Sequence, residues 1–161
     1  MVKKQKKLDM RRRRECKTNY TKRMILLKGR SPRLVVRKTN RYLIIQIIDS
    51  KQAQDSVLFN VNTKELLKHG WDEKKKGSLK SLKAGYLGGL LLGKKAKELK
   101  GRIILDSGLI PNTKGSRVYA VVKGVSDAGI EIAYDKKVMP DIESIKDENF
   151  EKVKQNIGGS K

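Results

Sequence analysis

The sequence of 161 residues is poor in the residue types that build several common kinds of site. It holds one cysteine, Cys16, and one histidine, His69, which excludes a disulfide framework and a zinc finger. The few aromatic residues form no stripe of the kind that stacks single-stranded bases. A lone cysteine also fits a reducing compartment, and we therefore expect a cytoplasmic protein.

Long apolar runs are missing as well. The longest run, residues 84–93, has ten residues of which four are glycine, whereas a membrane-spanning helix needs about twenty apolar residues. The basic N-terminal segment is not followed by the apolar core of a secretory signal. We therefore expect neither a membrane span nor secretion.

Acidic residues are scarce relative to basic ones. Asp and Glu total 17 against 39 Lys and Arg, which gives a formal net charge of +22. This balance excludes an ordinary metabolic enzyme surface and favours a polyanionic partner, nucleic acid before an anionic membrane. The excess is uneven, because residues 1–41 carry a net charge of +15 whereas residues 127–161 carry −2.

The basic N-terminal segment contains a lysine-rich stretch at 3–7 and four consecutive arginines at 11–14. Such a block repels itself, so we expect residues 1–29 to be disordered in the free protein. One interpretation is a solvated tail or a localisation signal. The other is an arm that orders on phosphates, which arginine favours because a guanidinium binds phosphate through two parallel hydrogen bonds.

Hydrophobic patterning predicts an α/β layered domain over residues 30–129. Apolar, β-branched runs at 33–37, 42–49 and 57–61 predict a three-stranded antiparallel meander, and the second run is apolar enough for a strand covered on both faces. Helical spacing at 78–100 precedes a fourth strand at 102–106, which should lie parallel to an earlier strand. A last core helix begins after Ser116 as its cap and stops at Gly129. Residues 130–161 form an acidic-leaning extension with a short helix near 147–156.

Three glycines, Gly85, Gly89 and Gly93, repeat every fourth residue along the first of these helices. Each costs about 1 kcal/mol of helix propensity relative to alanine. The regular stripe therefore predicts that this helix approaches another backbone closely, and we expect that backbone to be the sheet.

The loop at 108–116 lies between a strand and a helix, as a nucleotide-binding loop does. It lacks the P-loop pattern, because Thr113 stands where glycine is needed and Gly115 follows Lys114 in place of Ser or Thr. What remains is either a plain connection or an anion site built from backbone amides, Lys114 and Arg117.

Other candidate chemistry is sparse. Asp49 and Asp106 end predicted strands, as the carboxylates of a metal-dependent ribonuclease would, but no third acid joins them on the core strands. Trp71, close to His69, is more consistent with a packing anchor than with a base-stacking platform. Tyr20 and Tyr42 lie among basic residues, where they either stack on splayed bases or border the core.

Several stretches resemble one protein family in the family's own order. They are RRRRECKTNY (11–20), PRLVVR (32–37) with NRY (40–42), AGYLGGLLLGKKA (84–96), LDSGL (105–109), and KGSRV (114–118) through KG (123–124) and DAGIE (127–131). Together they resemble the archaeal and eukaryotic-type 5S-rRNA-binding proteins of the large ribosomal subunit, the "eighteen" family. Two departures are Cys16, where the family usually has glycine, and the less basic loop 110–112.

The resemblance implies a ribonuclease-H-like α/β fold without nuclease activity, and a structural role in packing 5S rRNA into the central protuberance. It implies no cofactor, metal or small-molecule substrate, and it names 5S rRNA, 23S-type rRNA and neighbouring ribosomal proteins as partners. A non-ribosomal RNA assembly factor stays open as an alternative. The expected RNA contacts are Arg11, Arg12, Arg13, Arg14, Lys17, Tyr20, Arg23, Arg30, Arg33, Arg37, Arg41, Tyr42, Lys114, Ser116 and Arg117.

Overall fold

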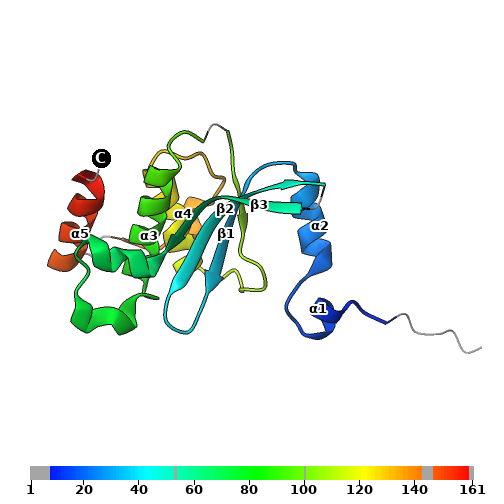
Figure 1. The fold of residues 1–161 in the computed structure, drawn as a ribbon, viewed down its shortest axis with the longest axis horizontal. Helices are drawn as coiled ribbons and strands as arrows, with labels where there is room; N and C mark the ends of the chain where they lie inside the picture. Colours follow the sequence, from blue (N-terminus) through cyan, green and yellow to red (C-terminus); the bar gives the residue numbers. More distant parts are fainter. Residues whose placement is uncertain (1–7, 53, 100, 143–146, 160–161) are drawn as a thin grey trace, which may run out of the picture.

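The computed structural model describes residues 8–52, 54–99, 101–142 and 147–159 (Figure 1). Its centre is a four-stranded sheet in the order β3-β2-β1-β4. The strands are β1 (Arg33–Lys38), β2 (Leu43–Lys51), β3 (Gln54–Asn62) and β4 (Ile104–Asp106). β1, β2 and β3 pair antiparallel, and β4 runs parallel to β1. The predicted meander and its parallel fourth strand are confirmed.

Helices lie on both sides of this sheet (Figure 1). α3 (Leu82–Lys95), α4 (Arg117–Asp127) and α5 (Glu148–Gly159) gather on one side, and α1 (Arg11–Arg14) and α2 (Tyr20–Lys28) lie on the other. Three short 3-10 helices, η1 (Thr63–His69), η2 (Glu73–Ser78) and η3 (Lys136–Val138), lie in the connections. No helix in the described part of the chain is both long and apolar enough to cross a membrane.

The two faces of the sheet differ in character. Leu43, Ile45 and Ile47 of β2 point toward α3 and α4 and are almost completely buried, whereas Ile44 and Gln46 on the other face are only half-buried. The prediction that β2 is covered on both faces is therefore wrong for much of the strand. The outer face of the sheet carries polar side chains from β1, β3 and β4, including Arg33, Asp55 and Asp106, and this is the face that α2 reaches.

The apolar core lies between the sheet and the three larger helices. Each fully buried leucine, isoleucine or valine contributes about 1.5–3 kcal/mol by leaving water. The C-terminal helix shares this core, because Phe150, Val153 and Ile157 of α5 are buried in it. The Phe150 ring lies 5.5 Å from the Tyr86 ring, and burial together with a hydrogen bond to Asp127 raises the pKa of Tyr86.

The glycine stripe faces mainly α4, so the expectation that it faces the sheet is corrected; at Gly85 a Cβ would also lie 3.4 Å from the Leu43 side chain of β2. A Cβ at Gly89 would lie under 3.0 Å from the Val121 carbonyl oxygen, and one at Gly124 of α4 would meet the Tyr86 carbonyl equally closely. Gly88, outside the stripe, is the glycine that faces the sheet at Ile45. The spacing predicts close approach correctly but does not identify the neighbour.

The start of α4 also differs from the prediction. Ser116 stands at the N-cap, but its side chain makes no capping hydrogen bond, and its buried Oγ has no hydrogen-bond partner among the described residues. The end agrees, because Gly129 takes the left-handed conformation with φ +98° just beyond the helix.

Replacing Gly89 or Gly124 by alanine should force α3 and α4 apart and cost about 1–3 kcal/mol of folding free energy, because overpacked cores shift backbone. Gly158→Ala is the matched control, since a Cβ there meets nothing within 4 Å. Thermal unfolding followed by circular dichroism measures the difference. Equal melting temperatures for all three variants would contradict the close helix–helix contact.

Candidate nucleic-acid interface

The described part of the basic arm, residues 8–29, contains two helices, α1 and α2. α1 is one turn of four arginines, flanked by ion pairs from Arg13 to Asp9 and from Arg11 to Glu15. Cys16 then takes the left-handed conformation with φ +50°, which glycine adopts more easily, so this turn has a glycine-type conformation although a non-glycine residue occupies it. The expectation of a disordered arm is corrected for these residues, and the lysine-rich stretch at 3–7 lies outside the described residues.

α2 begins at a sequence-encoded cap. The Asn19 side chain accepts a hydrogen bond of 3.0 Å from the backbone N–H of Lys22, as N-cap asparagines do. None of the α2 side chains is fully buried, and Met24 and Ile25 are 58% and 65% exposed. Apolar packing therefore contributes little to docking, and polar contacts must hold the helix on the sheet.

The centre of the outer sheet face is a buried arginine. Arg33 of β1 is 2% exposed and donates hydrogen bonds to Asp106 on β4 at 3.0 Å and to Asp55 on β3 at 2.8 Å. Its Nη2 also donates to the Ser50 hydroxyl. The predicted RNA contact at Arg33 is wrong, because its guanidinium is used inside the protein and has almost no accessible surface.

Two further arginines extend this arrangement to the surface. Arg23 of α2 donates to the second oxygen of Asp55 at 2.9 Å, and Arg37 of β1 donates to the Asp106 carboxylate at 3.3 Å and to its carbonyl at 2.9 Å. The charges thus alternate along a chain, which we call the ion chain: Arg23, Asp55, Arg33, Asp106 and Arg37. Arg33 and Asp106 are buried, the Asp55 side chain is 30% exposed, and both ends of the chain are arginines at the surface.

The environment of Asp55 keeps its carboxylate charged. Partial burial raises the pKa, but hydrogen bonds from Ser50 and Arg23 and the charges of Arg23 and Arg33 outweigh this effect, so the pKa of Asp55 is lowered. A second contact of α2 involves Lys22, whose ammonium donates to the Ser107 hydroxyl and to the Gly108 carbonyl, each at 3.1 Å. α2 is therefore tied to two places on the sheet.

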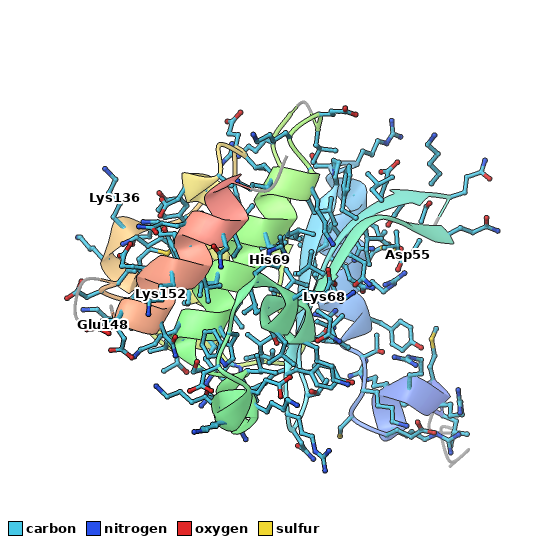
Figure 2. The ribbon with its side chains drawn as sticks, turned by 60° about the vertical axis from the view of Figure 1, so that its left-hand side comes forward. Asp55, Lys68, His69, Lys136, Glu148 and Lys152 are labelled. Atoms are coloured by element: carbon cyan, nitrogen blue, oxygen red, sulfur yellow. The ribbon has the colours of Figure 1, made fainter. Side chains whose placement is uncertain are left out.

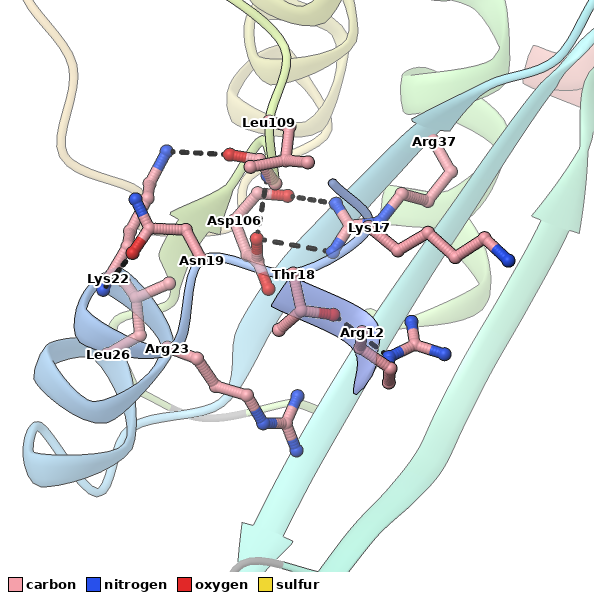
Figure 3. A pocket seen from close by; sticks show the side chains of 11 residues that line it. Arg12, Lys17, Thr18, Asn19, Lys22, Arg23, Leu26, Arg37, Asp106 and Leu109 are labelled. Atoms are coloured by element: carbon pink, nitrogen blue, oxygen red, sulfur yellow. Dashed lines mark hydrogen bonds and ion pairs between the residues drawn. The ribbon is translucent and has the colours of Figure 1, made fainter. Parts of the chain in front are cut away.

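A cationic pocket of about 120 Å³ lies where the arm meets the sheet (Figure 3). Its lining includes one acid, Asp106, whose two oxygens are already engaged by Arg33 and Arg37. The Arg12 side chain is held there by a hydrogen bond of 2.9 Å to the Thr18 hydroxyl. Five cationic residues line the pocket: Arg12, Lys17, Lys22, Arg23 and Arg37. This concentration of donors suits an anion such as a backbone phosphate.

A second pocket, of about 380 Å³, lies at the loop before α4. Ser116 and Arg117 line it together with Lys38 from the end of β1 and with Ile110 and Pro111. Lys114 is exposed but does not line the pocket. Of the two basic residues that the sequence assigned to an anion site at this loop, Arg117 lines the pocket and Lys114 does not. Lys38 was missed, because its turn gave no phosphate-binding pattern.

The remaining predicted contacts are spread around these pockets. Exposed members are Arg11, Arg13 and Arg14 on α1, Arg30 after α2, and Arg41 in the β1–β2 turn. Tyr20 is half-buried at the start of α2, and the half-buried Tyr42 packs against the core with the Lys64 ammonium 4.3 Å from its ring centre. Lys22 was missed, because its partners at Ser107 and Gly108 lie more than eighty residues away.

The acids considered for nuclease chemistry serve the structure. Asp106 belongs to the ion chain, and Asp49 accepts a hydrogen bond from the backbone N–H of Ser50. Across the described ranges, no three His, Cys, Asp or Glu side chains gather as a metal site would require. Trp71 is 7% exposed and donates from its indole to the Lys75 carbonyl, which confirms it as a packing anchor.

Replacing Arg33 by leucine should cost about 3–5 kcal/mol of folding free energy, because it leaves the buried Asp106 carboxylate without its deepest partner. Arg41→Leu, in the exposed β1–β2 turn, is the control and should change stability by about 0.5 kcal/mol or less. Urea unfolding of both variants measures the difference. If the two variants are equally stable, the ion chain does not hold the fold together.

Comparison with known proteins identifies the family to which the chain belongs. Residues 4–101 match the family model described as "Ribosomal large subunit proteins 60S L5, and 50S L18". The chain is 47% identical over 145 residues to the large ribosomal subunit protein uL18 of Korarchaeum cryptofilum, covering 89% of this chain and 72% of that protein. It is 38% identical over 149 residues to the uL18 protein of Methanoregula boonei, covering 92% and 83%. The chain therefore belongs to the uL18 family of large-subunit ribosomal proteins, which is a structural family and not a family of enzymes.

Proposed function

We propose that this protein binds 5S rRNA and helps to attach it to 23S-type rRNA at the central protuberance of the large ribosomal subunit. The observation that carries the proposal is the cationic pocket between the arm and the outer face of the sheet. Its donors come from α1, the α1–α2 connection, α2 and β1, so they meet only in the folded protein. Membership of the uL18 family supports a ribosomal RNA as the ligand.

Two kinds of contact contribute to RNA binding, one to its affinity and the other to its selectivity. The exposed arginines of α1 neutralise phosphates and release counterions, which supplies sequence-independent affinity. The sheet face, with Arg37 and the second pocket at Arg117, presents fixed positions that fit only an RNA folded with phosphates at matching places. Selectivity for one folded RNA follows from this fixed spacing, because charge alone would accept any RNA.

The opposite end of the molecule is available for protein neighbours. α5 and η3 lie far from α1 in both views, and they carry exposed charges of both signs, including Lys136, Glu148 and Lys152 (Figure 2). We expect neighbouring large-subunit proteins to contact this end, because its mixed charge does not favour RNA as strongly as the arm does.

Capture of RNA from ribosomal extracts tests the ligand. The full-length protein should retain one small RNA of about 120 nucleotides, the length that the resemblance to the 5S-binding family implies. With about eight phosphates neutralised, the logarithm of the binding constant should fall with the logarithm of salt concentration at a slope of roughly −6 to −7. A slope near −2, or equal binding of unrelated RNAs, would contradict the proposal. Salt-wash loss from mature subunits would favour an assembly factor instead.

Substituting Arg11, Arg12, Arg13 and Arg14 together by alanine should weaken RNA binding strongly and flatten the salt slope. The melting temperature of the free protein should stay nearly unchanged, because α1 buries no side chain. A control with the same loss of charge at the other end of the molecule replaces four exposed lysines by alanine: Lys74, Lys76, Lys136 and Lys152. Equal loss of affinity in the two variants would show that total charge, and not the arm, determines binding.

A further inference from the structure

Asp55 is an acidic side chain at the edge of the surface that we expect to bind RNA. It lies near the start of β3, next to the β2–β3 turn (Figure 2). A carboxylate in this position repels phosphate, so its presence there calls for a structural reason. That reason is visible in its contacts, because both of its oxygens accept charged or hydroxyl donors.

Four elements meet at this one carboxylate. Oδ1 accepts from Arg33 of β1 at 2.8 Å and from the Ser50 hydroxyl of β2 at 2.7 Å, and Oδ2 accepts from Arg23 of α2 at 2.9 Å. Asp55 thus connects the arm helix to the three strands of the meander. Charge-assisted hydrogen bonds of this kind are roughly twice as strong as neutral ones.

The link matters because α2 has few other anchors. The helix buries no side chain completely, and its second polar tie is the Lys22 contact with Ser107 and Gly108. Leu26, half-buried, adds limited apolar contact. Without Asp55, α2 would keep the Lys22 contact and the apolar contacts of half-buried side chains such as Leu26 and Leu27.

The position of α2 in turn sets the cations of the pocket. Arg12 in α1 and Lys17 in the connection to α2 lie N-terminal to the Asn19 cap, and Arg12 donates a hydrogen bond to Thr18, the residue before that cap. They face Arg37, which is fixed on the sheet by Asp106 (Figure 3). Holding both halves of the pocket in place before binding avoids part of the entropy cost of ordering them on the RNA.

We propose that Asp55 is a positioning residue for RNA binding: it increases affinity for a polyanion although its own charge opposes that binding. The inference rests on the proposed function, since it assumes that the cationic pocket receives RNA phosphate. It goes beyond that function by assigning a role to an acid that touches no phosphate.

The direction in which one substitution changes the affinity for RNA tests this role of Asp55. Asp55→Asn raises the net charge by one, so charge alone predicts tighter RNA binding, whereas positioning predicts weaker binding. We expect Asp55→Asn to weaken binding of 5S rRNA about threefold to tenfold, the range of one typical intramolecular hydrogen bond. Asp49→Asn is the matched control, because it makes the same change in the same hairpin, where Asp49 bonds only its neighbour Ser50 among the described contacts. Asp49→Asn should bind as tightly as the unmodified protein, or more tightly.

Two further measurements locate the effect. Amide hydrogen exchange in free Asp55→Asn should be faster over residues 20–28 and unchanged in α3 and α4, because asparagine keeps one oxygen that can accept from Arg33 and Ser50 but loses the second, which accepts from Arg23 of α2. In an Arg23→Gln background the weakening should disappear, since the link that Asp55 makes to α2 is already cut. Asp55→Glu keeps the carboxylate and should restore part of the affinity.

Binding by Asp55→Asn that equals or exceeds that of Asp49→Asn overturns the inference. So does loss of protection throughout α3 and α4, because Asp55 would then act on global stability and not on the arm. The proposed function is judged separately, by whether the unmodified protein selects 5S rRNA. If it binds another RNA instead, the comparison of Asp55→Asn with Asp49→Asn on that RNA still decides the role of Asp55.

Discussion

The structure depends on one buried charge, the guanidinium of Arg33. A charged group that leaves water is tolerated only when it is paired and hydrogen-bonded, and Arg33 meets this requirement with Asp55 and Asp106. Those two acids in turn engage Arg23 and Arg37, so the need to neutralise one arginine brings two more to defined places. A highly basic chain thereby uses a few of its scarce acids to arrange its cations instead of merely reducing its charge.

The opposite face of the sheet follows a different constraint, which is the close contact of α3 with α4. Gly89 and Gly124 let the two backbones touch, and each would place a Cβ against a carbonyl oxygen if it were any other residue. This pair of helices and α5 form the apolar core, and the outer face is left free of that task. The apolar core therefore lies on the helix-covered side of the sheet, whereas the ion chain and the proposed RNA-binding surface lie on the side of the arm.

The sequence was informative where structure is local. Alternating or continuous apolar runs located the four strands, and helical spacing located α3, α4 and α5, because these patterns depend on neighbours within a few residues. The sequence was not informative where the partner of a residue is distant along the chain. Asp106 lies 73 positions from Arg33, and their pairing gives no local pattern. Arg33, a basic residue in a basic region, was therefore predicted to contact RNA. The same reason explains the arm. Its charge alone predicts disorder, whereas the contacts that hold α2, at Asp55, Ser107 and Gly108, are distant in the sequence. For the RNA contacts other than Arg33, the residue types indicate a role that awaits a measurement.

Side-chain footprinting of the protein, free and bound to 5S rRNA, tests the central claim most directly. Reagents specific for lysine and arginine would report which cations the RNA covers. The account predicts strong protection of Arg12, Lys17 and Arg37 around the pocket, with Lys136 and Lys152 at the far end unchanged. Protection concentrated at the far end, with the pocket residues as reactive as in the free protein, would contradict it.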